Sequence, residues 1–108
     1  MNDAAIKELL ENTRTIAVVG FSENADRPSH YVSQYMATQG YRIIPVNPTI
    51  VSVLGQRCYA SLRDIPEPVD MVNVFRRPEA VPAIVEEALA IGARSLWLQE
   101  GVIHEATA

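Results

Sequence analysis

The sequence predicts an α/β fold: a doubly wound, mainly parallel sheet with helices on both faces. Four apolar runs, rich in aliphatic and β-branched residues, span residues 15–20, 41–46, 69–75 and 94–98. Each run ends in a short polar or glycine-containing sequence, and segments with helical spacing follow the first and the third. Strands buried on both faces have this near-continuous apolar character. The carboxyl ends of parallel strands share one edge, so we expect a ligand site there.

Two helices are expected in the first half of the chain. A short one precedes the first strand, with an apolar face formed by residues 6, 9 and 10. The next begins near Pro28 and Ser29, and Gly40 is typical of the position that follows a helix. The apolar residues of this second helix recur at helical spacing and predict its buried face: Val32, Tyr35 and Met36.

Residues 49–68 form the least regular part of the sequence. Gly55 indicates a turn, and residues 56–60 predict a short strand. Residues 61–65 predict a single helical turn, which Pro66 ends.

A third helix is predicted after the third strand. Its apolar residues recur at helical spacing: Val81, Ile84, Val85, Ala88 and Ile91. Pro82 must lie in the first turn, because deeper in the helix its ring would clash with a carbonyl four residues earlier. The helix therefore begins near Pro78 or Glu79, and Gly92 ends it.

The last residues predict a further helix that begins at Ile103, after Gly101, although the chain stops at Ala108. A helix of one turn has little independent stability. Either the sheet is complete without it, or the domain lacks a C-terminal helix and strand. In the second case an uncovered apolar edge favours self-association, so we expect a homodimer or reduced stability.

Length and composition indicate one domain that covers residues 1–108. The net charge of −4 argues against nucleic acid or an anionic membrane as a general partner. No apolar run reaches the ~20 residues of a membrane span, and the first residues do not resemble a signal peptide. The single cysteine, Cys58, fits a reducing compartment and is expected to be a small apolar core residue, so a cytoplasmic protein is predicted.

The loops at the predicted edge carry groups suited to an anionic ligand. Gly20 and Ser22 occupy the first strand-to-helix turn, where backbone N–H groups and a hydroxyl can hold phosphate. Three arginines lie at the same edge of this acidic protein: Arg27, Arg76 and Arg77. Phe75 adds an aromatic ring beside the cations, and residues 99–102 offer backbone contacts to a thin, extended ligand.

NAD is disfavoured as that ligand. The turn has one glycine, whereas the dinucleotide fingerprint G-x-G-x-x-G has three. The second strand ends in Asn47 and Pro48, where NAD-binding folds place an acidic residue for the ribose.

Covalent or metal chemistry has no recognisable residue pattern. His30 and His104 have no nucleophile or acid at a telling distance along the sequence, and we expect both at the surface or near a helix cap. Two histidines and one cysteine form no metal-ligand pattern. Glu100 is a carboxylate at the edge without a partner. No catalytic residue and no metal site are predicted.

Five segments together resemble the CoA-binding-domain family, small bacterial proteins similar to the amino-terminal domain of the succinyl-CoA synthetase α subunit. The segments are VVGFS at 18–22, RPS at 27–29, GYRIIPVNP at 40–48, VDMVNVFRRP at 69–78 and WLQEGV at 97–102. The resemblance implies a Rossmann-like fold that binds coenzyme A at the carboxyl edge. The residues that it implies for cofactor binding are Gly20, Phe21, Ser22, Arg27, Pro28, Ser29, Asn47, Pro48, Phe75, Arg76, Arg77, Gln99, Glu100, Gly101 and Val102.

We therefore expect a protein that binds coenzyme A or an acyl-CoA and performs no chemistry of its own. One alternative is a subunit or accessory domain of an acyl-CoA-processing enzyme, in which a partner supplies the catalytic groups. The other is a regulatory module that senses a nucleotide or NAD, against which the missing acid after the second strand counts.

Overall fold

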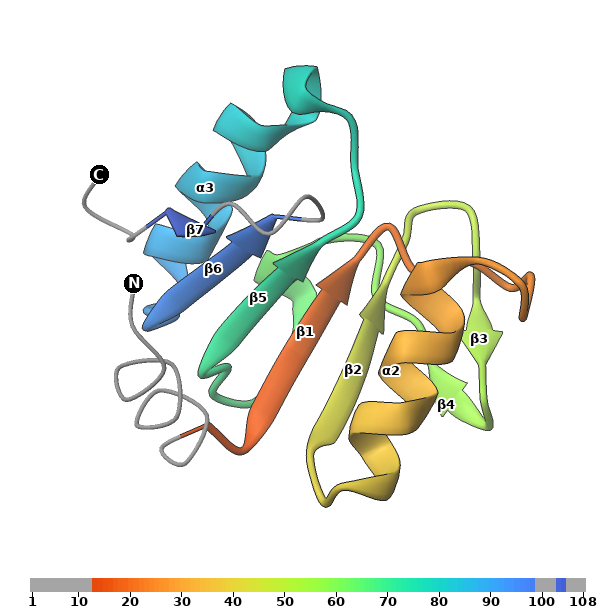
Figure 1. Ribbon diagram of the computed structural model, residues 1–108. Helices are drawn as coiled ribbons and strands as arrows, with labels where there is room; N and C mark the ends of the chain where they lie inside the picture. The colour runs from red at the N-terminus through yellow and green to blue at the C-terminus, as the bar shows by residue number, and fades with distance from the viewer. Residues whose placement is uncertain (1–12, 99–102, 105–108) are drawn as a thin grey trace.

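The computed structural model describes residues 13–98 and 103–104, and these form a twisted sheet with helices on both faces (Figure 1). The strands run in the order β2 (Arg42–Val46), β1 (Thr15–Val19), β5 (Met71–Val74), β6 (Ser95–Leu98) and β7 (Ile103–His104). The first four are parallel, and only β7 is antiparallel to its neighbour. The predicted doubly wound, mainly parallel α/β sheet is confirmed, and its four parallel strands are those that the apolar runs predict.

Two helices cover opposite faces of the sheet (Figure 1). Helix α2 (Pro28–Thr38) lies over β1 and β2, and α3 (Val81–Ala90) lies behind β5 and β6. Residues of β1 alternate between the two sides: Ile16 and Val18 belong to the core under α2, whereas Ala17 belongs to the core under α3. All three are at most 2% exposed, as expected for the central strand of a sheet covered on both faces.

The irregular region contains the predicted turn at Gly55 and the predicted helical turn. The strand predicted over residues 56–60 covers only residues 56–57, and it pairs with a preceding strand in a hairpin that was not predicted. Strands β3 (Ser52–Val53) and β4 (Gln56–Arg57) pair antiparallel around Leu54 and Gly55, both at positive φ. This turn geometry matches the twist of a two-residue hairpin loop. The 3₁₀ turn η1 (Leu62–Asp64) follows, and Ser61 caps it by accepting a hydrogen bond from the Arg63 N–H.

The start of the third helix has two parts. A 3₁₀ turn, η2 (Pro78–Ala80), precedes the regular helix α3, and Pro82 lies in the first turn of α3 as predicted. The regular helix therefore begins about one turn later than the expected start near Pro78. Gly92, with φ of +75°, follows its end.

The predicted buried face of α2 is only partly correct: Met36 packs against the core and Val32 is half-buried, but Tyr35 is not buried. Tyr35 is 62% exposed, whereas the residues buried on this helix are polar: Ser29, His30 and Ser33. These side chains can be buried because their polar atoms have partners nearby. The Ser33 hydroxyl, for example, donates to the Ser29 carbonyl at 2.6 Å.

The helix predicted to begin at Ile103 is also wrong, because Ile103 and His104 form β7. Their pairing with Trp97 and Leu96 extends the sheet beyond β6. Backbone hydrogen bonding along the open side of β6 outweighs the weak tendency of one helical turn to form. The short helix predicted around residues 6–10 lies outside the described residues.

Candidate functional site

The carboxyl ends of β2, β1 and β5 are joined at Gly20. Its N–H donates to the Val46 carbonyl at 2.9 Å, and the Phe75 N–H donates to the Val19 carbonyl at 2.9 Å. Gly20 has φ of +86°, and a Cβ there would lie 2.5 Å from the Phe75 carbonyl oxygen. Glycine is required for two reasons: residues with a side chain rarely adopt this φ, and there is no space here for a Cβ atom.

A buried polar cluster supports the loop that follows. The Ser22 N–H donates to the Ser29 hydroxyl at 2.9 Å. His30 Nδ1 lies 2.9 Å from the Ser22 carbonyl, which can only accept, so Nδ1 carries the proton. Phe21 packs edge-on against the His30 ring, with 5.5 Å between ring centres. His30 is 7% exposed, so it does not lie at the surface. It lies in the first turn of α2, which agrees with the alternative expectation of a position near a helix cap, and there it supports this loop.

Asn47 connects the end of β2 to the same loop. Its Nδ2 donates to the Phe21 carbonyl at 2.9 Å, while Oδ1 accepts from the N–H and the hydroxyl of Thr49. Both ends of the amide are therefore used within the protein. Cys58 lies below this turn, 3.6 Å from the Asn47 carbonyl, and burial raises the pKa of its thiol. Its expected role as a small core residue agrees with this position.

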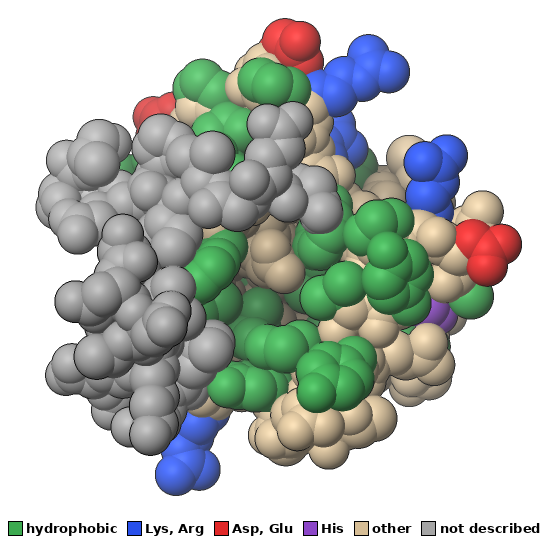
Figure 2. All heavy atoms as spheres, in the orientation of Figure 1, with side chains coloured by type: hydrophobic (Ala, Val, Ile, Leu, Met, Phe, Trp, Pro, Cys, Tyr) green, Lys and Arg blue, Asp and Glu red, His purple; other side chains and the backbone are tan. Residues whose placement is uncertain are grey.

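Two pockets adjoin each other at this edge. The first, the loop pocket, has a volume of about 390 Å³ and lies at the N-terminal end of α2. Its lining consists of Gly20, Ser22, Arg27, Pro28, Ser29, Phe75 and Arg76. Two cations, two hydroxyls and the positive end of a helix dipole meet there, and its described lining has no acidic side chain. In Figure 2 most visible basic side chains lie at the upper end of the molecule, toward which β1 and β5 point in Figure 1.

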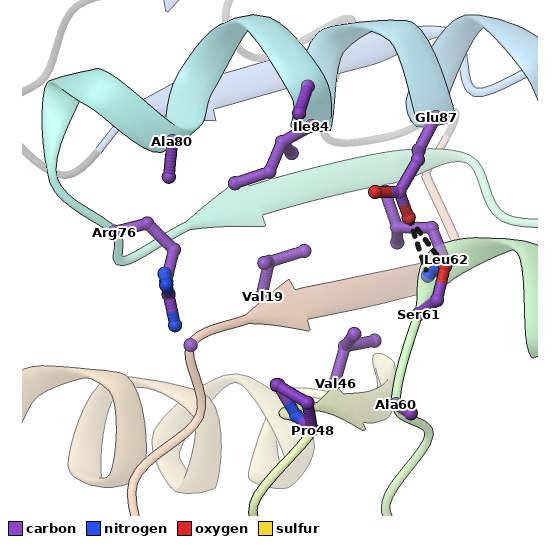
Figure 3. A pocket seen from close by; sticks show the side chains of 12 residues that line it. Val19, Val46, Pro48, Ala60, Ser61, Leu62, Arg76, Ala80, Ile84 and Glu87 are labelled. Atoms are coloured by element: carbon purple, nitrogen blue, oxygen red, sulfur yellow. Dashed lines mark hydrogen bonds between the residues drawn. The ribbon is translucent and has the colours of Figure 1, made fainter.

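The second, the helix pocket, lies between α3 and η1 and has a volume of about 200 Å³ (Figure 3). It shares Gly20 and Arg76 with the loop pocket. Its other lining residues are Val19, Val46, Pro48, Ala60, Ser61, Leu62, Ala80, Ala83, Ile84 and Glu87. Figure 3 shows Arg76 at one end, Glu87 at the other, and apolar side chains of Val19, Val46 and Ile84 between them.

Most of the helix pocket was not predicted from the sequence. Its wall at residues 60–62 belongs to the irregular region, which has no periodicity to interpret. One signal was present on α3 and the turn before it: Ala80, Ala83, Ile84 and Glu87 recur at helical spacing. Small residues and a carboxylate on an otherwise apolar stripe indicate a face that does not pack fully against the sheet.

The residues predicted for the site divide into four groups. Seven line the loop pocket, and Pro48 lines the helix pocket. Phe21 and Asn47 support the loops from within, and the Phe21 side chain is completely buried. Arg77 is exposed at the start of η2 and lines neither pocket. Gln99, Glu100, Gly101 and Val102 lie outside the described residues.

The described part of the chain contains neither a group of metal-ligating side chains nor a membrane-spanning helix. Among residues 13–98 and 103–104, no three His, Cys, Asp or Glu side chains group closely enough to hold a metal ion. In the same ranges, no helix has the length and apolar character needed to cross a membrane.

Comparisons with known proteins agree with this architecture. Uncharacterized protein YneT of Bacillus subtilis is 50% identical over 102 residues, which cover 94% of this chain and 76% of that protein. A solved structure of a hypothetical protein from Pyrococcus horikoshii superimposes with a TM-score of 0.91 at 36% identity, covering 94% of this chain and 72% of that one.

A similarity to part of a larger enzyme is also found. An ADP-forming acetate–CoA ligase of Archaeoglobus fulgidus is 30% identical over 83 residues, which cover 75% of this chain but only 12% of the ligase. The family model described as a CoA binding domain matches residues 14–108, nearly the whole chain. This protein therefore belongs to the CoA-binding domain family.

Proposed function

We propose that this protein binds coenzyme A or an acyl-CoA along the carboxyl edge of its sheet, in the loop pocket and the helix pocket together. The observation that carries the proposal is the junction of a cationic pocket and a largely apolar pocket at Gly20 and Arg76. Coenzyme A combines phosphates with uncharged parts, so one ligand could occupy both. Membership of the CoA-binding domain family supports this choice of ligand.

The phosphates would lie in the loop pocket. Arg27 and Arg76 can each grip phosphate oxygens through two N–H groups, and the N-terminus of α2 favours negative charge. The Ser22 hydroxyl lines the same space. The close packing of Gly20 against Phe75 brings backbone to the surface there without an intervening side chain.

NAD is a weaker candidate for the same groove. The turn at Asn47 and Pro48 presents no carboxylate to ribose hydroxyls, and the Asn47 amide already binds Phe21 and Thr49. The nucleotide-sensing alternative therefore has less support than coenzyme A.

We also propose that the chain, as one cytoplasmic domain over residues 1–108, performs no catalysis by itself. The alternative is that it acts as an accessory domain of an acyl-CoA-processing enzyme. The similarity to a segment of an acetate–CoA ligase favours that alternative.

We further propose that the protein self-associates through α2. Two tyrosines on this helix, Tyr31 and Tyr35, are 51% and 62% exposed. Sedimentation velocity would test this proposal.

Calorimetric titration of the protein with coenzyme A, acetyl-CoA and NAD tests the proposed ligand. We expect coenzyme A to bind with micromolar or tighter affinity, and NAD at least about tenfold more weakly, a difference of ~1.4 kcal/mol. Equal affinities, or no binding of coenzyme A, would contradict the proposal.

Native mass spectrometry of protein purified from its source would identify any acyl group by mass.

A further inference from the structure

Glu87 is a carboxylate at the end of the helix pocket that lies opposite Arg76, in a lining that is largely apolar. It extends from α3 toward η1, where Oε1 accepts hydrogen bonds from the Ser61 hydroxyl at 2.6 Å and from the Leu62 N–H at 3.2 Å. The two bonds join α3 to the wall of the helix pocket at residues 60–62. They also hold the carboxylate in one orientation, so it needs little reorganisation to meet a ligand.

The second oxygen of this carboxylate is available to a ligand. Among the described residues, both hydrogen bonds end on Oε1 and none on Oε2. In Figure 3 the other oxygen is turned away from Ser61, toward Ile84 and the interior of the pocket. A carboxylate oxygen in this position accepts an N–H donor and repels a phosphate.

The groove therefore has opposite charges at its two ends. Arg27 and Arg76 line the loop pocket, whereas Glu87 closes the far end of the helix pocket. Apolar side chains of Val19, Val46 and Ile84 separate the two ends (Figure 3). A ligand with phosphates at one end and an uncharged, N–H-bearing group at the other fits this arrangement in only one direction.

We propose that Glu87 determines the direction of the bound ligand by accepting a hydrogen bond from an uncharged, N–H-bearing group in the helix pocket. This inference rests on the proposed binding of coenzyme A and assigns a specificity role to a residue outside the loop pocket. Coenzyme A has two groups with the required chemistry: the amine of adenine and the amides of the pantetheine arm. Their shared chemistry is an N–H donor on a body that tolerates apolar surroundings.

Two fragments of coenzyme A distinguish these sources. Adenosine 3′,5′-bisphosphate contains the base without the arm, and 4′-phosphopantetheine contains the arm without the base. Calorimetric titration measures both fragments and intact coenzyme A against wild type, Glu87→Gln and Glu86→Gln. Glu86 is the matched control, because it is an exposed neighbour on α3 that lines neither pocket.

Removing a negative charge from a protein generally strengthens its binding of an anion, and Glu86→Gln measures that general effect. We expect Glu87→Gln to act in the opposite direction, lowering the affinity for coenzyme A and for one fragment about fivefold. In this variant the side-chain carbonyl keeps the bonds from Ser61 and Leu62, and an NH2 group replaces Oε2. The N–H of the ligand therefore loses its acceptor, which costs ~1 kcal/mol. The fragment that is affected identifies the group in the helix pocket.

Hydrogen exchange separates this role from a purely structural one. The side-chain carbonyl that Glu87→Gln introduces can still accept from Ser61 and Leu62, so this variant should keep the Leu62 amide protected, whereas Glu87→Ala should expose it. If Glu87→Gln binds coenzyme A and both fragments as wild type does, Glu87 only holds the wall and the inference is wrong. An equal loss for both fragments would also overturn it. Absence of coenzyme A binding by wild type would overturn the proposed function itself.

Discussion

A Cβ atom on Gly20 would lie 2.5 Å from the carbonyl oxygen of Phe75, so the chain after β1 and the chain after β5 approach each other too closely for any side chain at position 20. Gly20→Ala should therefore destabilise the protein by about 1–3 kcal/mol and weaken coenzyme A binding. The cost has two parts, the positive φ and the contact with the Phe75 backbone, which cannot easily move aside because its N–H is bonded to the Val19 carbonyl. Urea unfolding and calorimetry measure the two effects.

Gly92→Ala separates these parts. Gly92 also has a positive φ of +75°, but nothing lies within 4 Å of the position that its Cβ would occupy. The Gly92→Ala variant should lose only the stability that the positive φ costs, and it should bind coenzyme A as tightly as wild type does. Equal effects of the two substitutions would show that the Gly20–Phe75 approach is not tight in solution.

Arg76→Ala should weaken coenzyme A binding roughly tenfold to a hundredfold without unfolding the protein. Arg76 lines both pockets, and hydrogen bonds to a charged group contribute ~1.5–3 kcal/mol. Arg77→Ala removes the same charge one residue further along, outside both linings, and should change the affinity much less. A comparable loss in both variants would indicate a long-range charge effect, which added salt should then abolish.

Ser29→Ala should lower both stability and affinity, each by about 1 kcal/mol, because the Ser22 N–H loses its partner and the loop loosens. Ser33→Ala is the control on the same helix: Ser33 is equally buried, but its hydroxyl bonds only to the Ser29 carbonyl. Thermal melting and calorimetry should find a stability change in both variants and an affinity change only in Ser29→Ala. If neither affects binding, the loop does not need this support.

The environment of Asp70 predicts how the free energy of unfolding depends on pH. Its Oδ2 accepts hydrogen bonds from the N–H groups of Thr15 and Arg14, both at 3.0 Å, at the opposite end of β1 from the site. The bond from Thr15 is the main reason that the pKa of Asp70 lies below its usual value, while burial acts in the opposite direction. A lowered folded-state pKa gives stability that is present above the unfolded pKa of ~3.9 and is lost as pH falls through the folded value.

Asp70→Asn should therefore cost about 1 kcal/mol at pH 7, and wild type and variant should converge as the pH falls below the unfolded pKa of ~3.9 and through the lower folded-state pKa. Urea unfolding across this range measures the difference. Glu67→Gln is the control, since Glu67 pairs with Arg42 at an exposed site and should cost ~0.5 kcal/mol or less in 0.15 M salt. A constant difference between wild type and Asp70→Asn at all pH values would exclude Asp70 as the titrating group.

The strands and the cationic edge could be predicted from sequence because both depend on local composition. Apolar runs locate β1, β2, β5 and β6, and strand direction then brings Gly20 and Arg76 together. The fully buried residues of α2 could not be predicted, because Ser29, His30 and Ser33 are buried through hydrogen bonds that hydrophobic spacing does not encode. The wall at residues 60–62 depends on Glu87, which is 25 residues from Leu62 in the chain.

Arg76 contributes to both pockets, and this makes their occupancy thermodynamically dependent. Whatever binds in one pocket fixes a side chain that the other pocket also uses, so the second group finds a site that is already ordered. By linkage, the effect of either group on the other must be the same in both directions. The affinity of an intact ligand should then exceed what its separated halves suggest, and the excess should shrink when Arg76 is removed.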